Sequence, residues 1–201
     1  MGSMGPSVVV SLGASGSYVL FNYLPFKDNS AWINMFADKY GIDATKLKKI
    51  FTTYGMGTIA DMMAQNRVMQ HRTFHDYYGD IYGTASSVSM SLEWMESKGR
   101  PQTLRQEPKL QDYSAGLMQT LTKTASSLLG KNVTFRDLYD PATSIQAGIM
   151  YLAQQQQKYG GDGIEAILSS YNGGRPLTSN FLGYVCPALK KIGDFQEAGI
   201  A

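Results

Sequence analysis

One carboxylate is better placed for chemistry than any other residue of this sequence. Glu96 follows Val88 and Leu92 at spacings of four residues, so the three side chains share one face of a predicted helix and the acid points inward. The helix is expected to end directly afterwards, because Gly99 favours a C-terminal cap and Pro101 cannot continue a helix. A carboxyl group partly removed from water favours its protonated form, so Glu96 is a candidate general acid.

Two histidines form a second and weaker candidate site. His71 and His75 are four residues apart on a predicted helix and are followed by Asp76 and Asp80, a spacing that could present imidazoles and a carboxylate to zinc. The sequence lacks the glutamate that follows the first histidine in the common zinc-peptidase motif. We therefore interpret the histidines as a surface pair and expect neither a metal nor a cofactor.

The spacing of apolar residues predicts a mostly α protein, because few stretches alternate with a period of two. Loops are expected around Tyr77–Gly83 and over residues 98–113. We predict an irregular arm over residues 1–29, a helical segment packed on the catalytic domain over 30–85, and the catalytic domain itself over 86–201. The expected helices span residues 30–40, 45–51, 59–75, 84–96, 120–129, 141–159 and 164–170.

Composition excludes several classes of function. The 201 residues include 18 basic and 16 acidic side chains, a net charge of +2 without a long basic run, so nucleic-acid binding is not expected. Cys186 is the one cysteine and is interpreted as a packing residue. Polar residues and glycines interrupt the apolar segment Val8–Leu24, so it predicts neither a signal peptide nor a membrane contact.

Four short segments follow one another between residues 96 and 173: Glu96-Ser97, Gly116-Leu117-Met118-Gln119, the helix from Asp140-Pro141 to Tyr151-Leu152, and Ser170-Tyr171-Asn172-Gly173. In this order they resemble the catalytic domain of lytic transglycosylases related to goose-type lysozyme. The segment Lys98–Pro108 is similar to a loop that many phage versions place after the Glu-Ser pair. The resemblance covers roughly residues 86–185.

The resemblance implies a fold and a reaction. The fold would be a lysozyme-like helical domain of the soluble lytic transglycosylase type, with the N-terminal segment added to it. The substrate would be peptidoglycan, and one glutamate would act first as acid and then as base. Meanwhile the C6 hydroxyl of N-acetylmuramic acid attacks C1 to give a 1,6-anhydro product. On this basis Glu96 is the acid/base, and Tyr171 hydrogen-bonds and orients it.

The same resemblance implies the residues that hold the substrate. Ser97 and Gln119 would bind the sugar and its N-acetyl group, and Met118 and Tyr151 would form the wall of the cleft. Gly116 would belong to the cleft floor, and Asn172 would also contact substrate.

Other reactions stay open at this stage. A glycoside hydrolase normally needs a second carboxylate, for which Glu93, Glu107 and Asp112 are candidates, although Glu93 lies off the Glu96 face. A peptidase that cuts the stem-peptide crosslink, with or without zinc at His71 and His75, is an alternative. So is a non-catalytic wall-binding module of a virion.

The expected setting follows from the loop after Glu96 and from the absence of a recognisable signal. We expect a bacteriophage lysin for entry or host lysis, associated with the virion or acting in the host periplasm, and possible contacts with other virion proteins. A bacterial periplasmic enzyme is the alternative.

Overall fold

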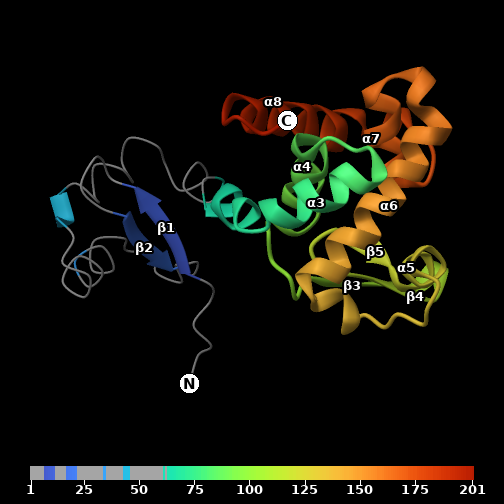
Figure 1. The fold of residues 1–201 in the computed structure, drawn as a ribbon, viewed down its shortest axis with the longest axis horizontal. Coiled ribbons are helices and arrows are strands. Elements are labelled where there is room, and N and C mark those ends of the chain that lie inside the picture. Colours follow the sequence, from blue (N-terminus) through green and yellow to red (C-terminus); the bar gives the residue numbers. More distant parts are fainter. Residues whose placement is uncertain (1–6, 12–16, 22–33, 35–42, 46–60, 62) are drawn as a thin grey trace. The chain divides into compact units, whose positions relative to one another are not determined.

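The computed structural model describes residues 7–11, 17–21, 34, 43–45, 61 and 63–201. The chain divides into two compact units, Met1–Arg67 and Val68–Ala201 (Figure 1). The second unit contains Glu96 and every other residue to which the sequence assigned a role in the site.

The described part of the first unit contains a β-hairpin. Strands β1 (Ser7–Ser11) and β2 (Ser17–Phe21) pair antiparallel, with Val9 opposite Val19. The prediction of an irregular arm is therefore wrong for these ten residues, whose valines and aromatics favour strands. The helices predicted over 30–40 and 45–51 fall outside the described residues, apart from residues 34 and 45.

The helix predicted over 59–75 is interrupted. Residues 63–69 are helical, Gln70 and His71 form a turn, and helix α3 (Arg72–Tyr82) starts after it. The loop predicted around Tyr77–Gly83 is wrong, because α3 continues through Gly79 and ends at Gly83 in a left-handed cap. Gly79 does not break the helix. It allows the backbone of Thr84 to lie close to α3, since a Cβ at residue 79 would lie 2.7 Å from the Thr84 carbonyl oxygen.

The helices predicted over 84–96, 120–129, 141–159 and 164–170 lie close to those positions, a further helix that was not predicted follows them, and the mostly α prediction is confirmed. Asp140 caps the N-terminus of α6, since its carboxylate accepts a hydrogen bond of 2.9 Å from the Thr143 amide. A π-helical turn, Phe181–Val185, leads into the last helix. The helices are α4 (Ser86–Ser97), α5 (Thr122–Leu129), α6 (Pro141–Tyr159), α7 (Ile164–Gly173) and α8 (Cys186–Glu197).

The segment predicted as a long loop after Glu96 contains one strand of a small sheet and the start of a second. Strands β3 (Leu104–Glu107), β4 (Asp112–Ala115) and β5 (Thr120–Leu121) pair antiparallel in the order β3-β4-β5. Arg105 lies opposite Ser114, and Ser114 lies opposite Leu121, so these three side chains share one face. Alternation over only four residues is too short a signal to separate a strand from a loop in the sequence.

The hydrophobic core lies between the helices of the second unit. Helix α4 packs against α8, and α3 packs against α6 (Figure 1). Leu92 of α4, Ile149 of α6 and Leu168 of α7 are fully buried in one cluster, which also contains Leu117 and Met118. None of the helices in the described part of the chain is long and apolar enough to cross a membrane.

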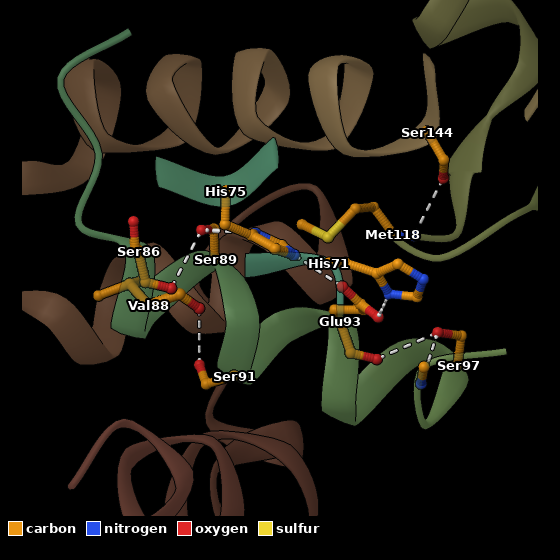
Figure 2. A network of polar contacts seen from close by, with 11 residues as sticks. His71, His75, Ser86, Val88, Ser89, Ser91, Glu93, Ser97, Met118 and Ser144 are labelled. Carbon is orange, nitrogen blue, oxygen red and sulfur yellow. Dashed lines mark hydrogen bonds and ion pairs between the residues drawn. The ribbon is translucent and has the colours of Figure 1, made fainter. Parts of the chain in front are cut away.

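A buried ionic cluster joins α3 to α4. The Glu93 carboxylate is fully buried and contacts His71 Nδ1 at 2.7 Å and His75 Nε2 at 2.6 Å. The other ring nitrogen of His75 lies 2.9 Å from Ser89 Oγ, which in turn donates to the Ser86 carbonyl (Figure 2). The interpretation of His71 and His75 as a surface pair is therefore wrong, because both side chains turn inward to Glu93.

The cluster keeps Glu93 ionised. Burial alone would raise the pKa of the Glu93 carboxyl, but the hydrogen bonds and charges of His71 and His75 outweigh burial and hold that pKa below its usual value. Because the folded pKa lies below the unfolded one, the ionised cluster stabilises the fold above the unfolded pKa. That contribution is lost as the pH falls through the folded pKa.

We predict that Glu93→Ala lowers the free energy of unfolding by about 3–5 kcal/mol at neutral pH, because it leaves two buried imidazoles without their partner. Urea denaturation followed by tryptophan fluorescence measures the change. The difference in the free energy of unfolding between the variant and the original protein should become smaller at acid pH, because Glu93 becomes protonated there.

Asp76→Ala is the matched control. It removes an acid from α3 whose ion pair with Arg72, 3.1 Å long, is exposed on both sides, so its cost should stay below about 1 kcal/mol. Equal losses in the two variants would contradict a special role for the buried cluster.

Candidate active site

A cavity of about 400 Å³ opens beside the C-terminal end of α4. Residues of the β3–β4 hairpin, of α6 and of α7 line the cavity together with Glu96. The other lining residues are Arg105, Glu107, Leu110, Ser114, Gln119, Thr120, Leu121, Thr124, Tyr151, Tyr171, Asn172, Gly173 and Gly174.

Glu96 stands in the last turn of α4, one residue before the helix ends. Lys98 follows in the left-handed conformation that closes the helix, with its amide bonded to the Trp94 carbonyl at 3.3 Å. The Tyr184 hydroxyl donates a hydrogen bond to Glu96 Oε1. Glu96 is thus anchored at its carboxylate and by its helix, and it is only partly exposed.

The surroundings of Glu96 favour a protonated carboxyl. Burial raises the pKa of Glu96, and the hydrogen bond from Tyr184 and the charges of Arg105 and Lys98 oppose only part of that rise. A carboxyl group with a raised pKa can keep its proton nearer to neutral pH, which is what a general acid needs.

The structure corrects the predicted role of Tyr171. Its hydroxyl donates to the Met118 carbonyl oxygen at 2.9 Å, rather than to Glu96, and its ring packs against Tyr151 with centroids 5.2 Å apart. Tyr171 still lines the cavity, and the nearby Glu96 charge adds to burial in raising the pKa of the Tyr171 hydroxyl. It connects α7 to the segment that carries Met118.

Tyr184 is the functional residue that sequence reasoning missed. It belongs to the π-helical turn before α8, where Tyr184, Ala188 and Ile192 are all buried at spacings of four residues. That spacing could have predicted an inward-facing tyrosine. It could not have shown that the hydroxyl reaches Glu96, which is 88 residues earlier in the chain.

Three of the predicted substrate-binding residues line the cavity: Gln119, Tyr151 and Asn172. Gln119 has a positive φ of 49°, and its amide nitrogen donates to the carbonyls of Thr103 and Gly116 at 3.0 and 2.9 Å. These bonds fix the Gln119 side chain through Nε2. The side-chain oxygen Oε1 is the group that could accept a hydrogen bond from a ligand.

The other three predicted substrate-binding residues are supports behind the cavity. Ser97 is buried, and its hydroxyl donates to the Glu93 carbonyl and accepts from the Gly99 amide, both at 3.2 Å. It therefore closes the end of α4 and does not line the cavity. Figure 2 shows Ser97 beside Glu93, which precedes it by about one turn of α4.

Gly116 and Met118 are outside the cavity lining and pack against neighbouring segments next to Gln119, which lines it. Gly116 has a φ of 77°, and a Cβ there would lie 2.0 Å from the Leu138 carbonyl oxygen, so only glycine fits. Met118 is fully buried against Gly148, where a Cβ would lie 2.3 Å from Met118 Cβ. The Met118 amide donates to Ser144 Oγ at 3.2 Å (Figure 2).

The three candidates for a second carboxylate have different places. Glu93 is held by the histidines, outside the cavity lining. Asp112 is buried and binds the α5 N-terminus, with its oxygens accepting from the Thr122 hydroxyl and from the Lys123 amide at 3.1 Å. Glu107 alone of the three lines the cavity.

In the described part of the chain, no group of three or more histidine, cysteine or acidic side chains is arranged to hold a metal ion. One ring nitrogen of each of His71 and His75 contacts Glu93, and the second nitrogen of His75 contacts Ser89 Oγ.

A family model described as the transglycosylase SLT domain matches residues 74–185, more than half of the chain. The match begins within α3 and ends with the π-helical turn that carries Tyr184. The lysozyme-like fold expected from the sequence is thereby confirmed. The chain therefore belongs to the transglycosylase SLT domain family of lytic transglycosylases, enzymes that cleave the glycan strands of peptidoglycan.

Proposed function

We propose that Glu96 alone supplies the acid and the base for cleavage of the bond between N-acetylmuramic acid and N-acetylglucosamine, with a 1,6-anhydromuramoyl end as product. The observation that carries this proposal is the placement of Glu96: it lines the cavity, its pKa is raised, and it accepts a hydrogen bond from Tyr184.

The proposed reaction has two proton transfers at one carboxyl. Protonated Glu96 first donates its proton to the glycosidic oxygen as the C1–O bond breaks, and positive charge develops at C1. The resulting carboxylate then accepts the proton of the C6 hydroxyl while that oxygen bonds to C1. Glu96 is protonated again at the end, so no water is consumed.

Tyr184 suits both halves of this cycle. As a donor to Oε1, its hydroxyl stabilises the carboxylate that exists between the two proton transfers. It leaves Oε2 for the glycosidic oxygen and then for the C6 hydroxyl. Gln119, Tyr151 and Asn172 line the same cavity and would hold the sugar in register with that oxygen.

We predict that Glu96→Gln lowers the rate of peptidoglycan cleavage at least about 100-fold, because the amide can neither donate an acid proton nor accept one. Mass spectrometry of fragments from purified peptidoglycan measures both rate and product. Anhydromuramoyl ends support the proposed reaction, reducing ends indicate a hydrolase, and free amines in cut peptides indicate a peptidase.

Glu165→Gln is the control for Glu96→Gln, because it makes the same substitution at an exposed position in the first turn of α7, outside the cavity lining. It should retain full activity. Full lytic activity of the Glu96→Gln protein, with its fold verified by circular dichroism, would rule out the proposed acid/base.

We predict different effects for the two buried tyrosines near Glu96. Tyr184→Phe removes the bond that favours the Glu96 carboxylate, so the pKa of Glu96 rises further and the pH–rate profile moves to higher pH. Tyr171→Phe removes a bond to the Met118 carbonyl and should cost about 1 kcal/mol of stability without moving the profile. A profile that moves in Tyr171→Phe and not in Tyr184→Phe would reverse these assignments.

We also propose that the protein is a bacteriophage lysin acting at the virion or in the host periplasm. The segment Lys98–Pro108, which resembles the loop of phage versions, supports this setting. Peptide mass spectrometry of purified virions tests it: the chain among virion peptides indicates entry, and its presence only in lysates of infected cells indicates host lysis. Absence from both would contradict a phage role.

A further inference from the structure

One face of the β3–β4 hairpin presents a cation and an anion to the cavity. Arg105 and Glu107 are two residues apart in β3, so both side chains lie on the same face, and Ser114 joins them from the opposite position in β4. All three line the cavity that contains Glu96.

Glu107 is held more firmly than Arg105. Its Oε1 accepts from Arg105 Nε at 2.5 Å and from the Ser114 hydroxyl at 3.2 Å, and its side chain is 25% exposed. The Arg105 side chain is 62% exposed. Arg105 therefore has room to move, whereas Glu107 is anchored to the neighbouring strand.

The charge of Arg105 acts on Glu96. It is one of the groups that oppose the effect of burial on that carboxyl. An unpaired guanidinium close to a carboxylate favours ionisation strongly, and an ionised Glu96 cannot act as an acid. A cation on this face of the hairpin is therefore compatible with acid catalysis only if its charge is balanced.

Lys98 also acts on Glu96, since its charge, like that of Arg105, opposes the effect of burial on that carboxyl. Lys98 Nζ lies 3.0 Å from the centroid of the Trp94 ring, and Lys191 of α8 lies 4.7 Å from the same centroid. Burial raises the pKa values of Tyr171 and Tyr184 well above the ordinary value, and that of Tyr151 is also raised, so all three stay protonated.

We propose that Glu107 is a positioning residue that acts through Arg105: by binding the guanidinium, it withholds that cation from Glu96 and leaves the Glu96 carboxyl able to keep its proton. This role rests on the proposed function of Glu96. It is distinct from that of a second catalytic carboxylate, because the hydrogen bonds of Glu107 go to Arg105 and Ser114.

The test combines a titration with a rate measurement. The full-length protein is labelled with carboxyl-¹³C glutamate, and the Glu96 signal is assigned by its loss in Glu96→Gln. In Glu107→Gln the Glu96 signal should titrate at lower pH than in the original protein. The alkaline limb of the pH–rate profile for peptidoglycan cleavage should also move to lower pH, so that the rate at a given pH on that limb falls about two- to fivefold.

Arg105→Gln should move the titration and the alkaline limb the other way, to higher pH. In the double variant Arg105→Gln/Glu107→Gln, the effect of the second substitution should largely vanish, because Glu107 then has no cation to withhold. Lys109→Gln is the matched control, since Lys109 is an exposed cation of the same hairpin outside the cavity lining, and it should change neither readout.

Two results would overturn the proposal. One is an unchanged Glu96 titration in Glu107→Gln. The other is an effect of Glu107→Gln that is equally large with and without Arg105, which would mean that Glu107 acts on Glu96 directly. Failure of the proposed function is seen separately, as activity retained by Glu96→Gln, because the carboxyl titration does not depend on turnover.

Discussion

Two acids on one helix have pKa values shifted in opposite directions, and the rest of the structure depends on the two environments that cause these shifts. Glu93 and Glu96 are a single turn apart in α4. Two histidines hold the pKa of Glu93 below its usual value, while burial with fewer compensating partners raises that of Glu96. When two carboxyl groups have environments that shift their pKa values in opposite directions, one is suited to be a structural anion and the other to be a general acid.

Each acid needs its own set of neighbours, and this need explains the arrangement of the helices. Helix α3 must lie beside α4 to bring His71 and His75 to Glu93. The turn before α8 must lie on another side of α4 to bring Tyr184 to Glu96. Helix α4 is therefore fixed by polar contacts near its C-terminal end as well as by the buried apolar core.

The sequence allowed prediction of the mostly α class, the helix that carries Glu96 and the capped start of α6, because these depend on local spacing and capping residues. It predicted Gln119, Tyr151 and Asn172 at the cavity through a resemblance. It did not predict that α3 continues through Gly79, because the sequence does not distinguish a glycine that permits a close contact within a helix from a glycine that ends one. Tyr184 and the Glu93 cluster depend on contacts between distant segments, which spacing along the chain does not encode.

The replacement of an expected loop by a hairpin also bears on the choice between one and two catalytic carboxylates. A flexible loop could bring Glu107 to a water molecule beside the sugar, as a hydrolase requires. In the hairpin, Glu107 Oε1 already accepts from Arg105 and Ser114, and the strand register keeps these partners adjacent. These hydrogen bonds occupy Oε1 of Glu107 and hold the side chain to the neighbouring strand. The geometry of the hairpin is thus compatible with the proposal that Glu96 is the single acid and base and that the C6 hydroxyl of the substrate is the nucleophile.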